Sequence, residues 1–249
     1  MCDTLVEMMG FSLCIPPLVW KPGITAQTVC QYLVRYPEMF SGATVLDMGC
    51  GCGILALQMA NLGSKTVLTV DLSREAVQAT QDNWLHNHFS SQAIVPIVSN
   101  GFDQIPRAYQ GQLDVIVSNP PSQPAKYSEP HSPQREAAHH WNEAGVDGRA
   151  VLDSLIEQGI HWLKPQGRMI FSMSSRHGWK QTQARLDELL KAQHISAWQI
   201  VHQISLPLEG FQQNYLDFWL AQQTDDDVRV FLKEGRYYHQ FMIIEVIRA

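Results

Sequence analysis

The fold is decided by the stretch Val45-Leu46-Asp47-Met48-Gly49-Cys50-Gly51-Cys52-Gly53. An apolar run leads into three glycines at alternate positions, and a second apolar run over residues 54–60 follows them. This order predicts the end of a buried strand, a tight turn and the beginning of a helix. Glycine lets the backbone approach a ligand closely, and the first turn of a helix leaves N–H groups unpaired. The stretch therefore predicts a ligand-binding loop.

Two further apolar runs end in polar residues. The run 67–70 ends in Asp71, from where a carboxylate can bind a pair of ribose hydroxyls. The alternative for this residue is an N-cap of a helix near Ser73. The run 113–117 leads into a turn that contains Asn119-Pro120-Pro121, and the two prolines make this turn stiff because they fix φ and lack N–H groups. The Asn119 side-chain oxygen and the Pro120 carbonyl could together hold an NH2 group, unless Asn119 only ends the strand.

The combination of Asp47, Asp71 and Asn119-Pro120-Pro121 resembles the class I S-adenosylmethionine (SAM)-dependent methyltransferases over roughly residues 19–174. The Asn-Pro-Pro turn is similar to that of the members that methylate nitrogen, such as the release-factor glutamine methyltransferases. The resemblance implies SAM as methyl donor and catalytic roles for Asn119 and Pro120. The donor-binding residues that it implies are Asp47, Gly49, Cys50, Gly51, Asp71, Leu72, Asn100 and Asn119. For Asp47 the alternative is a carboxylate that only braces the loop, and Asn100 stands where the family often has an acid facing the adenine.

The resemblance also implies an acceptor site, formed by Asn119, Pro121, Ser122, Trp20 and Trp141. Ser122 stands where the nitrogen methyltransferases usually have an aromatic residue, and Trp141 could replace that residue. Trp20 could equally belong to the core. The connection from Ser122 to Asp147 is long and contains several prolines and histidines. Structureless connections of this length are usually functional, so we expect a lid or a wall of the acceptor site here.

Short apolar runs alternate with helical patterns along most of the chain, which predicts an α/β fold with a parallel, doubly wound sheet. By resemblance, the sheet is Rossmann-like, mostly parallel and seven-stranded, with an antiparallel C-terminal strand. A single domain is expected over residues 1–249, with a segment 1–40 that covers donor and acceptor and a catalytic core 41–249. Helices are expected at 25–35 (with Thr25 as N-cap), 54–61, 74–87, 150–162 and 180–193. Strands are expected at 44–47, 66–70, 93–99, 113–118, 168–174 and 195–206, with a turn at 163–167 and a hairpin that joins 228–232 to 237–247. Residues 1–17 show no clear period, and 215–222 fits either a helix or a strand.

Composition limits the class of protein. The net charge is −6 and no dense run of Lys and Arg occurs, which disfavours nonspecific phosphate binding. Two of the five cysteines, Cys50 and Cys52, lie inside the glycine loop, and no second pair stands at zinc spacing, so we expect no metal. The odd number of cysteines and the lack of a signal-peptide pattern predict a cytoplasmic protein. No apolar run has the length of a membrane span.

The sequence therefore predicts an enzyme that methylates an amide, amine or guanidine nitrogen on a protein side chain or a small metabolite. Two alternatives stay open. One is an enzyme that methylates the exocyclic amine of adenine in RNA or DNA, although the missing aromatic residue at Ser122 removes a stacking face for a flipped base. The other is a SAM-binding subunit without catalysis, which an intact Asn119-Pro120-Pro121 turn disfavours. No membrane partner is expected, and the oligomeric state is open.

Overall fold

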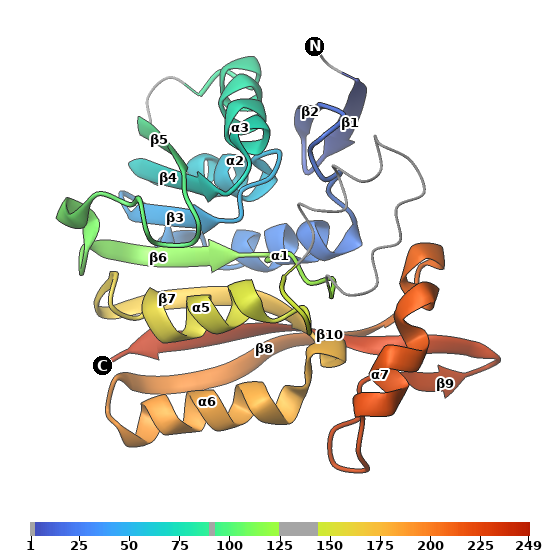
Figure 1. Cartoon of the computed structure of the whole chain (residues 1–249). Coiled ribbons are helices and arrows are strands. Elements are labelled where there is room, and N and C mark those ends of the chain that lie inside the picture. The colour runs from blue at the N-terminus through green and yellow to red at the C-terminus, as the bar shows by residue number, and fades with distance from the viewer. Residues whose placement is uncertain (1–2, 90–92, 125–143) are drawn as a thin grey trace.

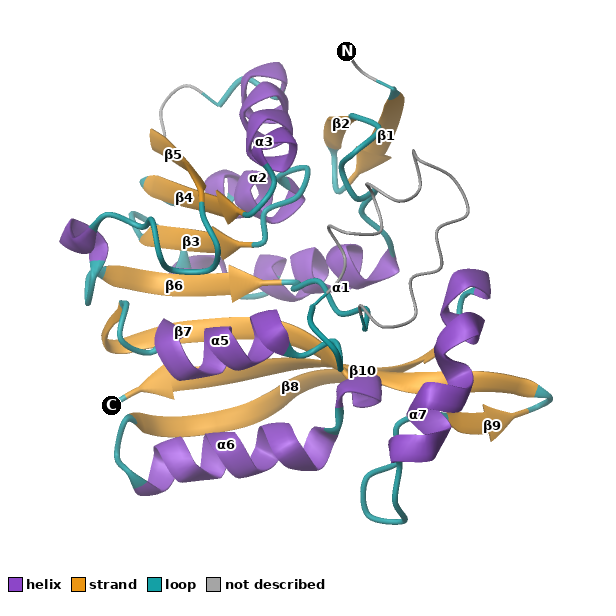
Figure 2. Ribbon diagram, in the orientation of Figure 1, coloured by secondary structure: helices purple, strands orange, loops and turns teal. Residues whose placement is uncertain are grey.

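The computed structural model of the protein describes residues 3–89, 93–124 and 144–249. A central sheet crosses the molecule, with helices on both of its faces (Figures 1 and 2). Its strand order is β5-β4-β3-β6-β7-β10-β8, and β9 pairs with β10 outside this path. The strands are β3 (Thr44–Met48), β4 (Thr66–Asp71), β5 (Ala93–Val98), β6 (Leu113–Ser118), β7 (Leu163–Ser174), β8 (Ile195–Pro207), β9 (Phe231–Lys233) and β10 (Arg236–Arg248).

The direction of the strands confirms the predicted α/β fold. The pairs that join β5, β4, β3, β6 and β7 are all parallel, whereas β10 runs antiparallel to both of its long neighbours. The predicted number of seven strands was too low, because the short β9 adds an eighth. It belongs to the predicted C-terminal hairpin, whose turn at Glu234 and Gly235 has φ values of 51° and 76°. Two consecutive positive φ values are typical of the tight turns that suit the twist of a hairpin.

The residues of each central strand alternate between two hydrophobic cores. Val45, Val67 and Val115 pack on one side, in the core that includes residues of α1 (Ile24–Val34), α2 (Ile54–Asn61) and α3 (Arg74–His86). Their neighbours Leu46, Leu68 and Ile116 pack on the other side, with residues of α5 (Ala150–Gly159) and α6 (Trp179–Lys191). A strand that is buried on both faces needs apolar residues at every position, which explains the continuous apolar runs of the sequence.

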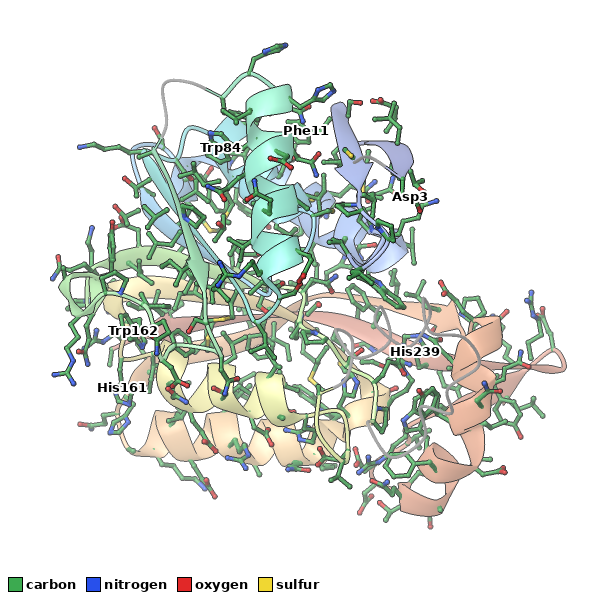
Figure 3. The ribbon with its side chains drawn as sticks, turned by 45° about the horizontal axis from the view of Figure 1, so that its top comes forward. Asp3, Phe11, Trp84, His161, Trp162 and His239 are labelled. Carbon is green, nitrogen blue, oxygen red and sulfur yellow. The ribbon has the colours of Figure 1, made fainter. Side chains whose placement is uncertain are left out.

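A hairpin near the N-terminus was not predicted. Strands β1 (Thr4–Met8) and β2 (Phe11–Ile15) form a separate two-stranded sheet, joined by Met9 and Gly10 with φ values of 55° and 83°. Asn83 of α3 and Asn87, the C-cap of that helix, hold β2 by bonding to the backbone of Cys14 and Ser12, respectively. Phe89 contacts both Phe11 and Trp84, which Figure 3 labels, at centroid distances of 6.1 and 5.1 Å. The hairpin therefore depends on α3, a partner distant in the sequence.

Several element boundaries differ from the prediction. Helix α1 begins at Ile24 after Gly23 without a side-chain cap, so Thr25 is not its N-cap. Strand β7 begins at Leu163, where a turn was predicted, because Leu163 pairs with Leu113 across an irregular register. Residues 216–222, which fitted either type, form helix α7 (Leu216–Gln222), and its Trp219 is buried in a small third cluster. Among the described helices, none is both long and apolar enough to cross a membrane.

Candidate active site

The glycine loop between β3 and α2 is held against the neighbouring strand. The amides of Gly49 and Cys50 both donate to the carbonyl of Val70 on β4, at 2.8 and 2.9 Å. Gly51 and Gly53 have φ values of 54° and 88°, a region that favours glycine. A Cβ at Gly53 would lie 2.8 Å from Thr80, whereas a Cβ at Gly51 would meet no atom within 4 Å. The loop thus packs tightly on α3 at Gly53 and leaves open space beside Gly51.

Asp71 joins the glycine loop to the beginning of α3. One carboxylate oxygen accepts from the amide of Gly51 and the other from the amide of Ser73, both at 2.9 Å. Burial raises the pKa of the Asp71 carboxyl, while the backbone amide bonds oppose that shift. Ser73 is the N-cap of α3, because its hydroxyl accepts from the amide of Ala76. Asp71 is therefore not the cap, and each of its oxygens retains a lone pair for a ligand.

Asp47 has a different environment from Asp71. Its side chain is fully buried, and Oδ2 accepts from the amide of Ala56 in the first turns of α2 at 3.0 Å. Oδ1 is also buried and has no hydrogen-bond partner among the described residues. Burial raises the pKa of the carboxyl to about 7. Asp47 does not line the cavity beside the loop, so its contacts support the loop-bracing alternative rather than direct contact with a donor.

A first cavity lies beside the glycine loop, at the carboxyl ends of β3 and β4. Its walls include the predicted donor-binding residues Gly49, Cys50, Gly51, Asp71, Leu72, Asn100 and Asn119. The Cys50 thiol is buried and accepts from the hydroxyl of Thr80, which agrees with the expectation that it packs around the loop. Leu72 is 61% exposed and Asn100 is exposed, so both are available to a ligand. The open space at Gly51, the Asp71 carboxylate and the apolar walls suit a nucleoside with a polar tail, as in SAM.

A second cavity, of about 420 Å³, adjoins the first. Trp20, Asn119 and Pro121 line both cavities, whereas Pro120 and Ser122 line only the second. Apart from Asp47, the described residues predicted to bind donor and acceptor therefore lie around two adjoining cavities, with Asn119 in the walls of both. Trp141 and the centre of the connection predicted as a lid, residues 125–143, lie outside the described residues.

The Asn119 amide is oriented by two hydroxyl groups that the sequence did not indicate. Its Oδ1 accepts from Ser172 on β7 at 2.6 Å, and its Nδ2 donates to Thr25 on α1 at 3.4 Å. Ser172 reaches Asn119 because Ser118 and Phe171 are paired across parallel strands, so the residues that follow them are also adjacent. The only hint in the sequence is a serine within the otherwise apolar run of β7.

The second cavity is also lined by an arginine and two histidines that were not predicted. Arg176 and His177 follow β7, and His239 lies on β10 (Figure 3). Burial lowers the pKa of His177 to about 3 and that of His239 to about 2, so both imidazoles are neutral near pH 7. His177 contacts the carbonyl of Ser122 at 3.0 Å and His239 contacts the hydroxyl of Ser174 at 2.8 Å.

Comparisons with known proteins find methyltransferases. The family model described as ribosomal protein L11 methyltransferase (PrmA) matches residues 25–123. A putative protein N5-glutamine methyltransferase of Methanocaldococcus jannaschii is 28% identical over 193 residues, which cover 78% of this chain and 91% of the relative. A release factor glutamine methyltransferase of Thermosynechococcus vestitus is 30% identical over 138 residues, or 53% of this chain and 46% of the relative. This chain thus spans most of the first relative and about half of the second.

A solved structure confirms the fold over nearly the whole chain. It is that of the 16S rRNA N2 G1207 methyltransferase (RsmC) of T. thermophilus in complex with AdoMet and guanosine. The TM-score is 0.62 at 15% identity, and the match covers 99% of this chain and 50% of the other. At this identity the similarity concerns the fold alone.

Proposed function

We propose that this chain, which is a SAM-dependent methyltransferase, transfers the methyl group to an amide nitrogen of a protein side chain. The family match and the relatives confirm the predicted enzyme class and its methyl donor. The acceptor is the proposed part. One observation carries it: the Asn119 amide, held by Ser172 and Thr25, lies at the junction of the two cavities.

The residues of the first cavity suit the donor. Asp71 would accept from ribose hydroxyls through the lone pairs that its two amide bonds leave free. The glycine loop would approach the donor at Gly51, where the backbone leaves open space. Asn100 would accept from the amine of the base in place of the acid that the family often has. When bound, SAM would supply a methyl group on a positively charged sulfur. This sulfur is a good leaving group, so a nitrogen lone pair can take the methyl group without help from an acid.

The protein contributes mainly by positioning the acceptor. Ser172 occupies one acceptor site of the Asn119 side-chain oxygen and leaves another for an N–H of the substrate. The carbonyl of Pro120, on the wall of the second cavity, would accept the other N–H. An NH2 group held at both hydrogens turns its lone pair toward the first cavity. Asn119 does not change charge near neutral pH, so it holds the nitrogen over a wide pH range. Such positioning can contribute several kcal/mol.

The nature of the acceptor follows from the polarity of the junction and from the relatives. Asn119 and Pro120 offer two oxygens, which match the two hydrogens of a primary amide. Both relatives carry glutamine in their names. We therefore propose a glutamine side chain as the acceptor group.

Fractionation of a cell extract tests this function. Purified protein is incubated with donor labelled on the methyl group and with separate protein, RNA and small-molecule fractions. We expect the label in the protein fraction, on glutamine after digestion, and much less with Asn119→Ala. Label in the RNA fraction would instead support methylation of adenine. Normal donor binding without labelling of any fraction would support a non-catalytic subunit.

A further inference from the structure

A buried arginine lines the proposed acceptor cavity without an ionic partner. Arg176 lies in the short 3-10 turn Ser175–His177 that follows β7 and is 4% exposed. Its Nε donates to the hydroxyl of Ser174 at 2.9 Å. Its Nη1 is buried without a hydrogen-bond partner, and no carboxylate lies within 4.0 Å of the guanidinium, among the residues that the structure describes.

This arginine brings a positive charge into the cavity, whose lining also includes Lys21 and Glu209. Burial lowers its pKa to about 10, so the guanidinium is still charged at neutral pH. Glu209 lines the same cavity and opposes this shift from a distance, but it forms no ion pair with Arg176. The guanidinium stacks over the ring of Trp219, 4.8 Å from its centroid. A cation–π contact offsets only part of the several kcal/mol that burial of an unpaired charge costs.

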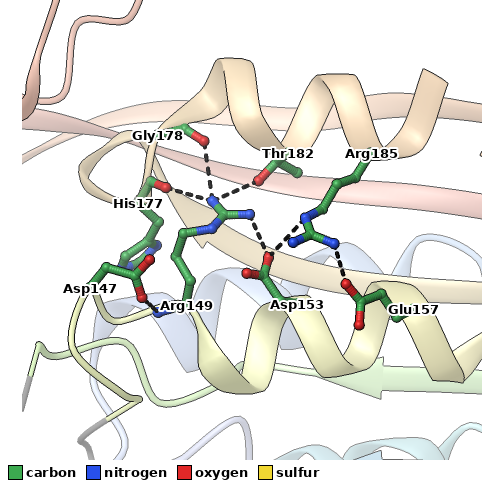
Figure 4. Close-up of polar contacts among 8 residues, drawn as sticks. All are labelled: Asp147, Arg149, Asp153, Glu157, His177, Gly178, Thr182 and Arg185. Atoms are coloured by element: carbon green, nitrogen blue, oxygen red, sulfur yellow. Dashed lines mark hydrogen bonds and ion pairs between the residues drawn. The ribbon is translucent and has the colours of Figure 1, made fainter. Parts of the chain in front are cut away.

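Two other arginines bond to the backbone around the turn that carries Arg176. Figure 4 shows Arg149 below it, whose Nη1 donates to the carbonyls of His177 and Gly178 and to the hydroxyl of Thr182. Arg229 donates to the carbonyl of Arg176 at 3.2 Å. The guanidinium is therefore held in place before a ligand arrives, which lowers the entropy that binding must remove.

The distance from Arg176 to the methylation point follows from strand geometry. Ser172, which bonds to Asn119, and Ser174, which bonds to Arg176, lie two residues apart on β7 and face the same cavity. Side chains at this spacing point to the same side of a strand, about 7 Å apart. The distance between an acceptor nitrogen bound at Asn119 and the Arg176 guanidinium would thus be roughly the length of one side chain.

We propose that the acceptor carries a carboxylate about one side-chain length from the methylated nitrogen, and that Arg176 binds this carboxylate. The inference rests on the proposed amide acceptor. In a protein substrate this carboxylate could have two sources. One is the free carboxylate of a C-terminal glutamine, and the other is an acidic side chain next to the glutamine. A planar guanidinium suits either, because it can bind both carboxylate oxygens.

Binding of three small probes tests this without requiring turnover. N-acetylglutamine carries the amide and a free carboxylate, N-acetylglutamine amide lacks the charge, and N-acetylglutaminyl-aspartic acid α-amide carries the charge on a side chain. Each is titrated into the protein with S-adenosylhomocysteine present, and affinity is read from NMR chemical shifts. We expect one of the two charged probes to bind at least about tenfold more tightly than the uncharged one, as for a hydrogen bond to a charged group. The better of the two charged probes identifies the source.

Two variants assign the preference to Arg176. Arg176→Met keeps the unbranched apolar stem of the side chain but removes the charged guanidinium, and we expect it to bind all three probes equally. Arg107→Met removes an exposed arginine far along the chain and should keep the wild-type preference. Melting temperature and affinity for S-adenosylhomocysteine report whether Arg176→Met is folded, and the comparison of probes on the wild type needs no variant.

The possible results separate this inference from the proposed function. Equal binding of charged and uncharged probes by the wild type, or binding of none, overturns the carboxylate proposal, even if glutamine in the protein fraction is methylated. A charge preference that Arg176→Met abolishes supports the proposal. It does so even if no glutamine is methylated, a result that overturns the proposed function instead.

Discussion

Replacement of Asn119 by alanine removes the oxygen that we propose holds the acceptor nitrogen. That oxygen accepts one bond, from Ser172 at 2.6 Å, and faces the junction of the cavities with its second acceptor site. Loss of one positioned hydrogen-bonding group costs about 3 kcal/mol of transition-state stabilisation. At about 1.4 kcal/mol for each factor of ten, methyl transfer should slow roughly a hundredfold. Affinity for S-adenosylhomocysteine should stay nearly unchanged, because many other residues line the first cavity.

Ser172→Ala probes how the same amide is oriented. It keeps the Asn119 oxygen but removes its fixed partner, a neutral hydrogen bond of about 1 kcal/mol, so kcat should fall about fivefold. Because Ser172 acts through Asn119, the double variant should be no slower than Asn119→Ala alone. Ser205→Ala is the matched control, since its hydroxyl bonds to Gln240 on an exposed part of β8 and β10.

Two quantities are measured. Initial rates of methyl transfer are read from the label that the protein fraction gains, and affinity for S-adenosylhomocysteine is measured by calorimetry. The reasoning is refuted if Asn119→Ala turns over at the wild-type rate with normal donor-product affinity. Fully additive losses in the double variant would show that Ser172 acts independently of Asn119. A loss of donor-product affinity equal to the loss of rate would place Asn119 in the donor site alone.

Three further predictions follow from the glycine loop and its two carboxylates. Asp71→Ala should weaken binding of S-adenosylhomocysteine by about 1–3 kcal/mol in calorimetry, the scale for hydrogen bonds to a charged group; unchanged affinity would remove Asp71 from the donor site. Gly53→Ala should lower the melting temperature more than Gly51→Ala, because both have positive φ but only the first would bring a Cβ to 2.8 Å from Thr80; equal shifts would contradict the packing. Burial raises the pKa of Asp47 to about 7, above an unfolded value of about 4, so the folded state binds more protons between these values. The free energy of unfolding of the wild type should therefore fall relative to that of Asp47→Asn as pH rises from about 4 to about 7, and denaturant titrations that show a constant difference would contradict it.

Local patterns in the sequence were sufficient to predict which strand ends carry the main residues of the site. Three local features each lie within a few residues of the end of their own strand. They are the glycine loop around Gly49, the acid at Asp71 and the Asn119-Pro120-Pro121 turn. Parallel strands bring such ends to one edge of a sheet, so the presence of a shared cavity at this edge could be predicted. The structure places Asp71 and Asn119 on the walls of that cavity. The long apolar runs likewise predicted the central strands, because burial on both faces demands them.

Other features depend on partners distant in the sequence, and only the tertiary structure decided them. Asp47 and Asp71 both lie near strand ends beside the loop, but Asp47 is fully buried and bonded to the amide of Ala56, contacts that favour a bracing role. Strand β2 could not be predicted from its own residues, because its backbone bonds to asparagine side chains at α3, far along the chain. Ser172 and Arg176 acquire their proposed roles from Asn119, which follows the neighbouring strand, and from the second cavity, which all three residues line. Local patterns in the sequence determined the fold and the Asn119 turn, and the resemblance to the class I methyltransferases implied the donor. The orientation of that amide and the charge of the proposed acceptor site arise from contacts between separate elements, which no local pattern records.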